Sequence, residues 1–107
     1  METDCVMVWT TTGSGTDGEK LASTLVRERL AACVNVLPDM ESTYWWRNQV
    51  ERGRERQLII KTTAARVPAL KARLHELHDY ELPEFSVLPI VGGSEAYLRW
   101  IRESVAE

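Results

Sequence analysis

Two extended runs decide the fold of this chain: Thr43-Tyr44-Trp45-Trp46-Arg47-Asn48-Gln49-Val50 and Arg54-Glu55-Arg56-Gln57-Leu58-Ile59-Ile60-Lys61-Thr62-Thr63. They flank Glu51-Arg52-Gly53, so the stretch predicts one hairpin with a charged tip. Arms of about 8–10 residues would span roughly 27–34 Å. Because this exceeds the usual strand length, we expect the outer part of the hairpin to extend beyond the rest of the domain.

A strand, a helix and a second strand are expected before the hairpin. Residues 5–12 are apolar and β-branched, which indicates a buried strand. Thr16 and Glu19 have the spacing of a capping box, and the apolar residues of 17–30 follow at helical intervals. Residues 32–37 predict a second strand that stops or bulges at Pro38.

A helix, a strand and a last helix are expected after the hairpin. The helix covers residues 66–79, the strand covers residues 85–91, and Ser94 caps the last helix. The order β-α-β-β-α-β is that of a ferredoxin-like α+β fold, an antiparallel sheet with two helices on one face, here followed by a C-terminal helix. The other face of the sheet is expected to be covered by something else.

Composition predicts one globular domain over residues 1–107, with 44% hydrophobic and 27% charged residues. The net charge of −3 argues against nucleic acid and an anionic membrane as partners. The sequence shows neither a signal peptide nor an apolar run of about 18 residues. Cys5 and Cys33 lack zinc-finger and redox spacing, so we expect reduced thiols in a cytoplasmic protein.

Enzymatic motifs are weak. Gly13-Ser14-Gly15-Thr16-Asp17-Gly18 matches G-x-G-x-x-G, but a long hairpin follows where a dinucleotide fold needs further βα units. No nucleophile stands in the sequence context that would activate it. We therefore expect no enzyme and no organic cofactor.

The segment from His78 to Phe85 carries one imidazole and three carboxylates. His78 with Glu81 and Glu84 forms a mixed nitrogen and oxygen set that suits Cu(II) or another divalent cation. The alternative is that Pro83 ends a helix and the carboxylates are solvated. Cys33 is either a small buried residue or a soft-metal ligand.

The aromatic cluster Tyr44-Trp45-Trp46 predicts a core or subunit-interface role, because the acidic balance of the chain disfavours base stacking. Alternation along a strand puts Tyr44 and Trp46 on one face and Trp45 on the other. Lys61 is either an exposed residue or the cationic partner of Glu81 or Glu55.

Taken in order, several segments resemble the CutA family of divalent-cation tolerance proteins. They are Leu30-Ala31-Ala32-Cys33-Val34-Asn35-Val36, Ser42-Thr43-Tyr44-Trp45-Trp46, Glu55 with Ile59-Ile60-Lys61-Thr62, His78-x-Tyr80-Glu81-x-Pro83-Glu84, and Tyr97-x-x-Trp100-Ile101. The resemblance implies a tight homotrimer of ferredoxin-like subunits whose hairpins reach across to neighbours. It also implies an association with copper and other divalent cations and a cytosolic location.

Three positions depart from the family pattern. Asp79 stands where the family usually has proline, Asn48 where it tends to have glycine, and Trp9 where some relatives carry a cysteine. Asparagine tolerates positive φ best among the residues other than glycine, so we expect a bulge at Asn48 to be kept.

The resulting expectation is a homotrimer that binds divalent cations at or near subunit interfaces. The expected metal ligands are His78, Glu81, Glu84 and Cys33, and the residues expected to line the inter-subunit cleft are Tyr44, Trp46, Lys61 and Tyr80. The alternative is a PII-like trimeric sensor, which has the same subunit order and binds small molecules between subunits.

Overall fold

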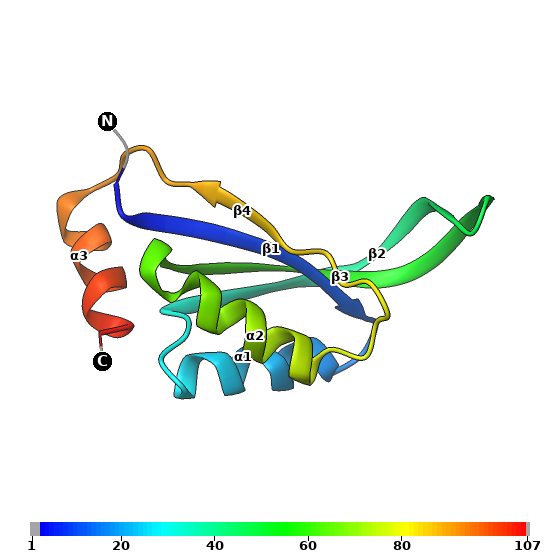
Figure 1. The fold of residues 1–107 in the computed structure, drawn as a ribbon, viewed down its shortest axis with the longest axis horizontal. Helices are drawn as coiled ribbons and strands as arrows, with labels where there is room; N and C mark the ends of the chain where they lie inside the picture. Colours follow the sequence, from blue (N-terminus) through cyan, green and yellow to red (C-terminus); the bar gives the residue numbers. More distant parts are fainter. Residues whose placement is uncertain (1–2, 107) are drawn as a thin grey trace.

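A four-stranded antiparallel sheet in the order β2-β3-β1-β4 forms the centre of the computed structural model, which describes residues 3–106 (Figure 1). The strands are β1 (Cys5–Gly13), β2 (Cys33–Trp46), β3 (Gln49–Thr63) and β4 (Ser86–Pro89). The helices are α1 (Asp17–Arg27), α2 (Val67–Leu77) and α3 (Glu95–Ser104), with a 3-10 turn at Ala64–Arg66. This arrangement confirms the predicted ferredoxin-like order.

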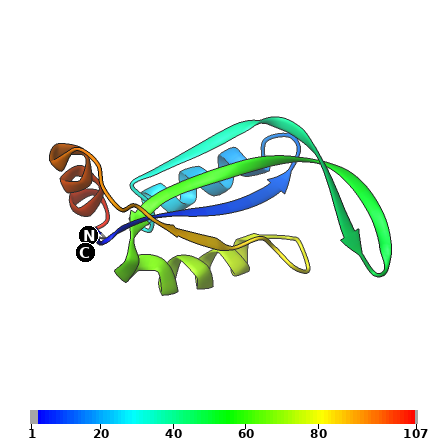
Figure 2. The same cartoon turned by 90° about the horizontal axis from the view of Figure 1, so that it is seen from above.

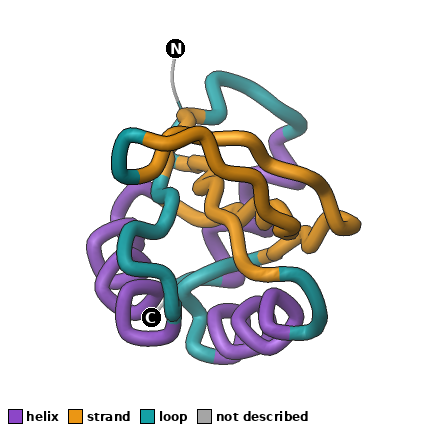
Figure 3. The backbone as a smooth tube through the Cα atoms, turned by 90° about the vertical axis from the view of Figure 1, so that its right-hand side faces the viewer, coloured by secondary structure: helices purple, strands orange, loops and turns teal. Residues whose placement is uncertain are grey.

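The core lies between the sheet and the two helices α1 and α2. Val8 of β1 and Ile60 of β3 are fully buried against Leu25 of α1 and Leu70 of α2. Figure 3, turned to look along the sheet, shows the strands above these two helices. Because strand side chains alternate, Trp9 faces the other way. We call that second surface the open face of the sheet.

The hairpin of β2 and β3 is longer than the rest of the sheet and curves away from it (Figure 2). The molecule measures 44 Å along its longest axis, so the predicted overhang is present. A register shift between Val36 and Asp39 shows that the chain bulges at Pro38 and does not stop there. Trp45 and its cross-strand partner Val50 remain 74% and 59% exposed.

The predicted tip at residues 51–53 was wrong. The chain turns at Arg47 and Asn48, with φ of 52° and 65°, while Gly53 stays in β3 opposite Ser42. A two-residue turn with positive φ at both positions matches the twist of the flanking strands. Asn48 therefore has the expected positive φ, but it lies in this turn and not in the predicted bulge. The polar run at 51–53 therefore belongs to an exposed strand that only resembles a turn in composition.

Element ends differ from the sequence predictions in detail. Thr16 is the N-cap of α1, but its side chain makes no capping bond, and Glu19 pairs instead with Arg56 at 3.1 Å. The capping box was therefore wrong. At the last helix, the Ser94 hydroxyl accepts the Tyr97 amide at 3.2 Å, as predicted. Among residues 3–106 we find no helix of the length and apolarity needed to cross a bilayer.

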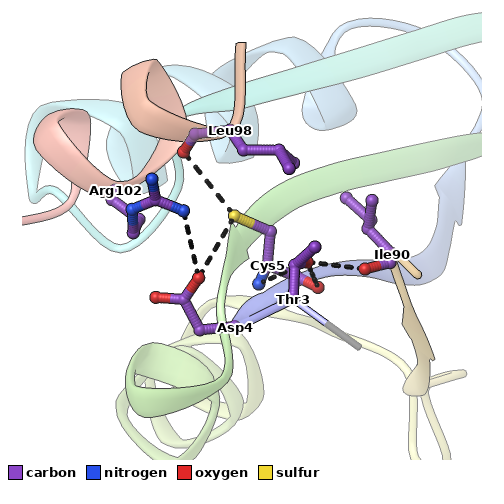
Figure 4. A network of polar contacts seen from close by, with 6 residues as sticks. All are labelled: Thr3, Asp4, Cys5, Ile90, Leu98 and Arg102. Atoms are coloured by element: carbon purple, nitrogen blue, oxygen red, sulfur yellow. Dashed lines mark hydrogen bonds and ion pairs between the residues drawn. The ribbon is translucent and has the colours of Figure 1, made fainter. Parts of the chain in front are cut away.

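Helix α3 packs on the end of the sheet opposite the hairpin, where Cys5, Leu98 and Ile101 are buried together. Figure 4 shows the polar contacts that hold it: Arg102 pairs with Asp4 at 3.3 Å, and the Cys5 thiol lies 3.7 Å from the Leu98 carbonyl. Burial raises the pKa of the Cys5 thiol, and the neighbouring Asp4 adds to this. The helix therefore covers one end of the open face and leaves the hairpin end uncovered.

Candidate functional site

The candidate site lies where β1 ends, at the base of the hairpin. The segment between α2 and β4 passes there beside β3. It brings His78 against the end of β1 and Tyr80 against Glu55 of β3. Three parts of the chain that are distant in sequence therefore meet at one place.

His78 is the buried centre of this arrangement, with only 1% of its side chain exposed. It caps the C-terminus of α2 with an extended backbone, which turns its ring back toward the sheet. Nε2 bonds to the Thr11 carbonyl, and Nδ1 accepts the Tyr80 backbone N–H at 3.1 Å. These partners require the neutral tautomer with its proton on Nε2. Both ring nitrogens are thus engaged within one chain.

Tyr80 stacks edge-on against His78, with ring centroids 4.6 Å apart, and its hydroxyl donates to Glu55 at 3.2 Å. Burial raises the pKa of Tyr80 to about 12, and the Glu55 carboxylate contributes to the same shift. Tyr44 is close enough to Tyr80 to add to this rise in its pKa, and the Tyr44 hydroxyl lies 3.4 Å from where a Cβ on Gly53 would be. The predicted cleft residues Tyr44 and Tyr80 are therefore neighbours, with Glu55 beside Tyr80.

Glu84 lies at the same edge, in the segment that leads into β4. Its carboxylate accepts from the Gln57 amide at 3.3 Å and from the Ser86 hydroxyl at 3.3 Å. Gln57 also donates to the Thr10 carbonyl at 2.8 Å, which ties the segment to β1. The sequence analysis missed Gln57, although its spacing of two from Glu55 on a strand was an available signal.

Glu81 points the other way, toward the hairpin turn. It pairs with Arg47 at 3.1 Å, and the two side chains are 69% and 73% exposed. The Arg47 guanidinium also lies over the Trp46 ring, 5.4 Å from its centroid. Since exposed ion pairs contribute little to stability, the Glu81 carboxylate is easily redirected. Arg47 was not among the predicted site residues.

Cys33 and Lys61 lie elsewhere in this chain. They pair with each other across β2 and β3, and Lys61 is four positions along β3 from Gln57, roughly 13 Å at the strand rise. Lys61 donates to the Asn35 side chain, so neither Glu81 nor Glu55 is its partner. Within residues 3–106 no three His, Cys, Asp or Glu side chains converge to hold a metal ion. One chain therefore does not bring the four predicted ligands together.

Comparison with known proteins gives the family. The family model described as "CutA1 divalent ion tolerance protein" matches residues 6–104. This chain belongs to the CutA1 family. The predicted family is therefore confirmed, and the alternative of a PII-like sensor is not favoured.

Curated CutA proteins align along most of the chain. The divalent-cation tolerance protein CutA of Thermus thermophilus is 46% identical over 84 residues, covering 78% of this chain and 82% of that protein. The chloroplastic CutA 1 of rice is 40% identical over 102 residues, covering 95% of this chain. The chain spans only 58% of this rice relative and 54% of the chloroplastic CutA of Arabidopsis thaliana.

Solved CutA structures share the fold. CutA from Xylella fastidiosa superposes with a TM-score of 0.93 at 40% identity, covering 96% of this chain and 99% of that chain. CutA1 from rice gives a TM-score of 0.94 at 39% identity, covering 99% of this chain and 97% of that chain. A structure from Archaeoglobus fulgidus is described as a periplasmic divalent cation tolerance protein. The locations named for CutA relatives thus differ among organisms.

Proposed function

We propose that this chain acts in tolerance to divalent cations by binding them as a cytoplasmic homotrimer, with the cation held between subunits. Membership of a divalent-cation tolerance family supports the general role. One observation carries the proposal of a cation site between subunits: the carboxylates of residues 79–84 make few bonds. They also lie next to the hairpin, whose outer strands are uncovered in a single chain. The proposal is one of binding and includes no catalytic step.

The exposed hairpin supports assembly. Trp45 and Val50 present apolar surface on strands that extend beyond the sheet. On the open face, the buried indole N–H of Trp9 has no hydrogen-bond partner within residues 3–106. Buried donors are nearly always paired, and exposed strand edges invite association. A closed ring of subunits would cover both features.

The carboxylates of the site supply the cation donors in this proposal. Asp79 and Glu81 are exposed at 85% and 69%, and Glu84 accepts only two bonds at 3.3 Å. Because they do not converge in one chain, donors from a second subunit must complete the site. His78 holds this segment in position. For His78 to act as a ligand, one of its ring nitrogens must first release its hydrogen bond.

Cu(II) is the cation to test first, because it heads the divalent affinity order at nitrogen and oxygen sites. Cys33, a soft ligand, lies at the other end of β3 and would bind from a different part of an interface. The cytoplasmic location rests on the two free thiols, Cys5 and Cys33.

Assembly is tested by light scattering coupled to size exclusion. We expect a mass about three times the 12.2 kDa of the chain. A stable monomer at micromolar concentration would refute the trimer.

Cation binding is tested by calorimetry with Cu(II) in a His75→Ala background, which removes the exposed imidazole of α2. Glu84→Gln is expected to weaken binding by about tenfold, or about 1.4 kcal/mol. Glu103→Gln on α3, at the opposite end of the sheet, is the matched control and should change nothing. Equal losses in both variants would show that the metal binds the acidic surface without a site.

A further inference from the structure

A cavity lies at the end of the molecule opposite the hairpin, where the C-termini of α1 and α3 approach each other. It has a volume of about 330 Å³ and is lined by Val26, Arg27, Arg29, Ala31, Ala32 and Ser104. The cavity shares no residue with the carboxylate segment described above.

The two arginines have no carboxylate partner in the part of the chain that the structure describes. Arg29 bonds only to a neutral group, the Ser104 carbonyl, at 3.0 Å. Glu28, which stands between them in sequence, is held at both oxygens by Arg73, at 2.9 Å each. Two guanidinium groups without a carboxylate partner among the described residues therefore line one cavity of a protein whose net charge is −3.

Helix ends alone do not account for this charge. Arg27 is the last residue of α1 and Ser104 the last of α3, so both arginines sit where cations stabilise a helix C-terminus. Each terminus carries about half a negative charge, so two termini offset about one of the two positive charges.

The backbone conformation of Arg29 also supports a role for its side chain. Arg29 has φ of 59°, the left-handed conformation that glycine usually supplies just after a helix. Its amide donates to the Val26 carbonyl at 3.0 Å and the Leu30 amide to the Leu25 carbonyl at 3.0 Å, so the turn itself needs no side chain. A strained arginine at a glycine position indicates a use for the guanidinium.

We propose that this cavity is a binding site for a small oxyanion, with Arg27 and Arg29 as the groups that recognise it. The guanidinium of Arg29 is oriented by its bond to Ser104 and retains further N–H groups for the ligand. Arginine presents its donors in a planar fork that matches phosphate and carboxylate groups. Both ligand types share this chemistry.

The test is calorimetry on the full chain in a buffer free of phosphate, at constant ionic strength. Inorganic phosphate and malonate are titrated separately. The ligand that binds more tightly shows whether the cavity prefers a phosphate or a carboxylate group. Arg29→Gly is expected to weaken binding by roughly tenfold while preserving the fold, since glycine suits the left-handed turn. Arg27→Gln should also weaken binding, and thermal unfolding verifies that both variants fold.

Arg52→Gln, on the hairpin, is the matched control: it removes the same charge far from the cavity and should leave the affinity unchanged. The proposal is overturned if neither ligand binds at concentrations of about 10 mM. It is also overturned if Arg52→Gln weakens binding as much as the cavity variants, because the anion would then respond only to total charge. Because no metal is used, the result is independent of the cation proposal.

Discussion

Replacing His78 with alanine tests the role that the structure gives to this residue. The ring is buried, and it joins the Thr11 carbonyl of β1 to the backbone amide of Tyr80. Its removal leaves a cavity and two polar groups without their partner. Together these effects should lower the free energy of unfolding by about 3–5 kcal/mol.

His75 supplies the control for this experiment. It lies on the same helix, but it is exposed and bonds only to the Lys71 carbonyl of its own helix at 2.8 Å. His75→Ala should change the stability by less than about 0.5 kcal/mol. Urea unfolding at one fixed chain concentration measures both variants, since assembly would make the stability depend on concentration.

The outcome separates two roles for His78. A large loss of stability without metal supports the structural role. If His78→Ala were no more destabilising than His75→Ala, the two hydrogen bonds would be unimportant, and the reasoning about the buried ring would fail. His78 would then be free to act as a ligand, as the sequence alone predicts.

Other predictions follow from single positions. The pKa of Tyr80 is raised from 10.0 to about 12, so between these pH values the folded state keeps the phenol proton while the unfolded chain loses it. The free energy of unfolding should therefore fall as pH rises through this window, and Tyr80→Phe should lessen that fall in urea titrations. Gly18→Ala should lower the free energy of unfolding by about 1–3 kcal/mol, because the added Cβ would lie 2.8 Å from the Thr12 hydroxyl. Gly13→Ala is the control: its Cβ would meet nothing within 4 Å, so the variant should be near neutral in the same assay. Asn48→Gly should raise the melting temperature, since it relieves a φ of 65° at a gain of about 0.5–1 kcal/mol.

The order of the elements could be predicted because each depends on local periodicity. The β-branched run of β1 and the helical spacing of α1 are visible in the sequence, and the length of the hairpin follows from its two extended runs. The turn could not be located in the same way. Arg47-Asn48 and Glu51-Arg52-Gly53 are both polar, and only the register of β2 against β3 decides between them.

The sequence drew attention to the polar segment after α2, but it could not give the direction of the individual side chains. The dense polar segment after α2 does lie beside Tyr44 and Glu55, which the sequence singled out. The direction of each side chain depends on tertiary contacts: His78 turns inward to β1, while Glu81 turns outward to Arg47. Neighbours in sequence therefore serve different parts of the structure.

The distinction has a physical origin in how polar groups are satisfied. A buried imidazole must bond at both nitrogens, and here the backbone of Thr11 and Tyr80 provides both bonds. A carboxylate on an exposed loop can remain hydrated and so stays available to a partner or an ion. Histidine is the residue type most typical of a metal ligand, but here both nitrogens of His78 are used by the fold. The groups that remain available to a cation are the carboxylates that follow it in sequence. In the function proposed above, the cation site is therefore built from those carboxylates and from the surface that a second subunit would bring to them.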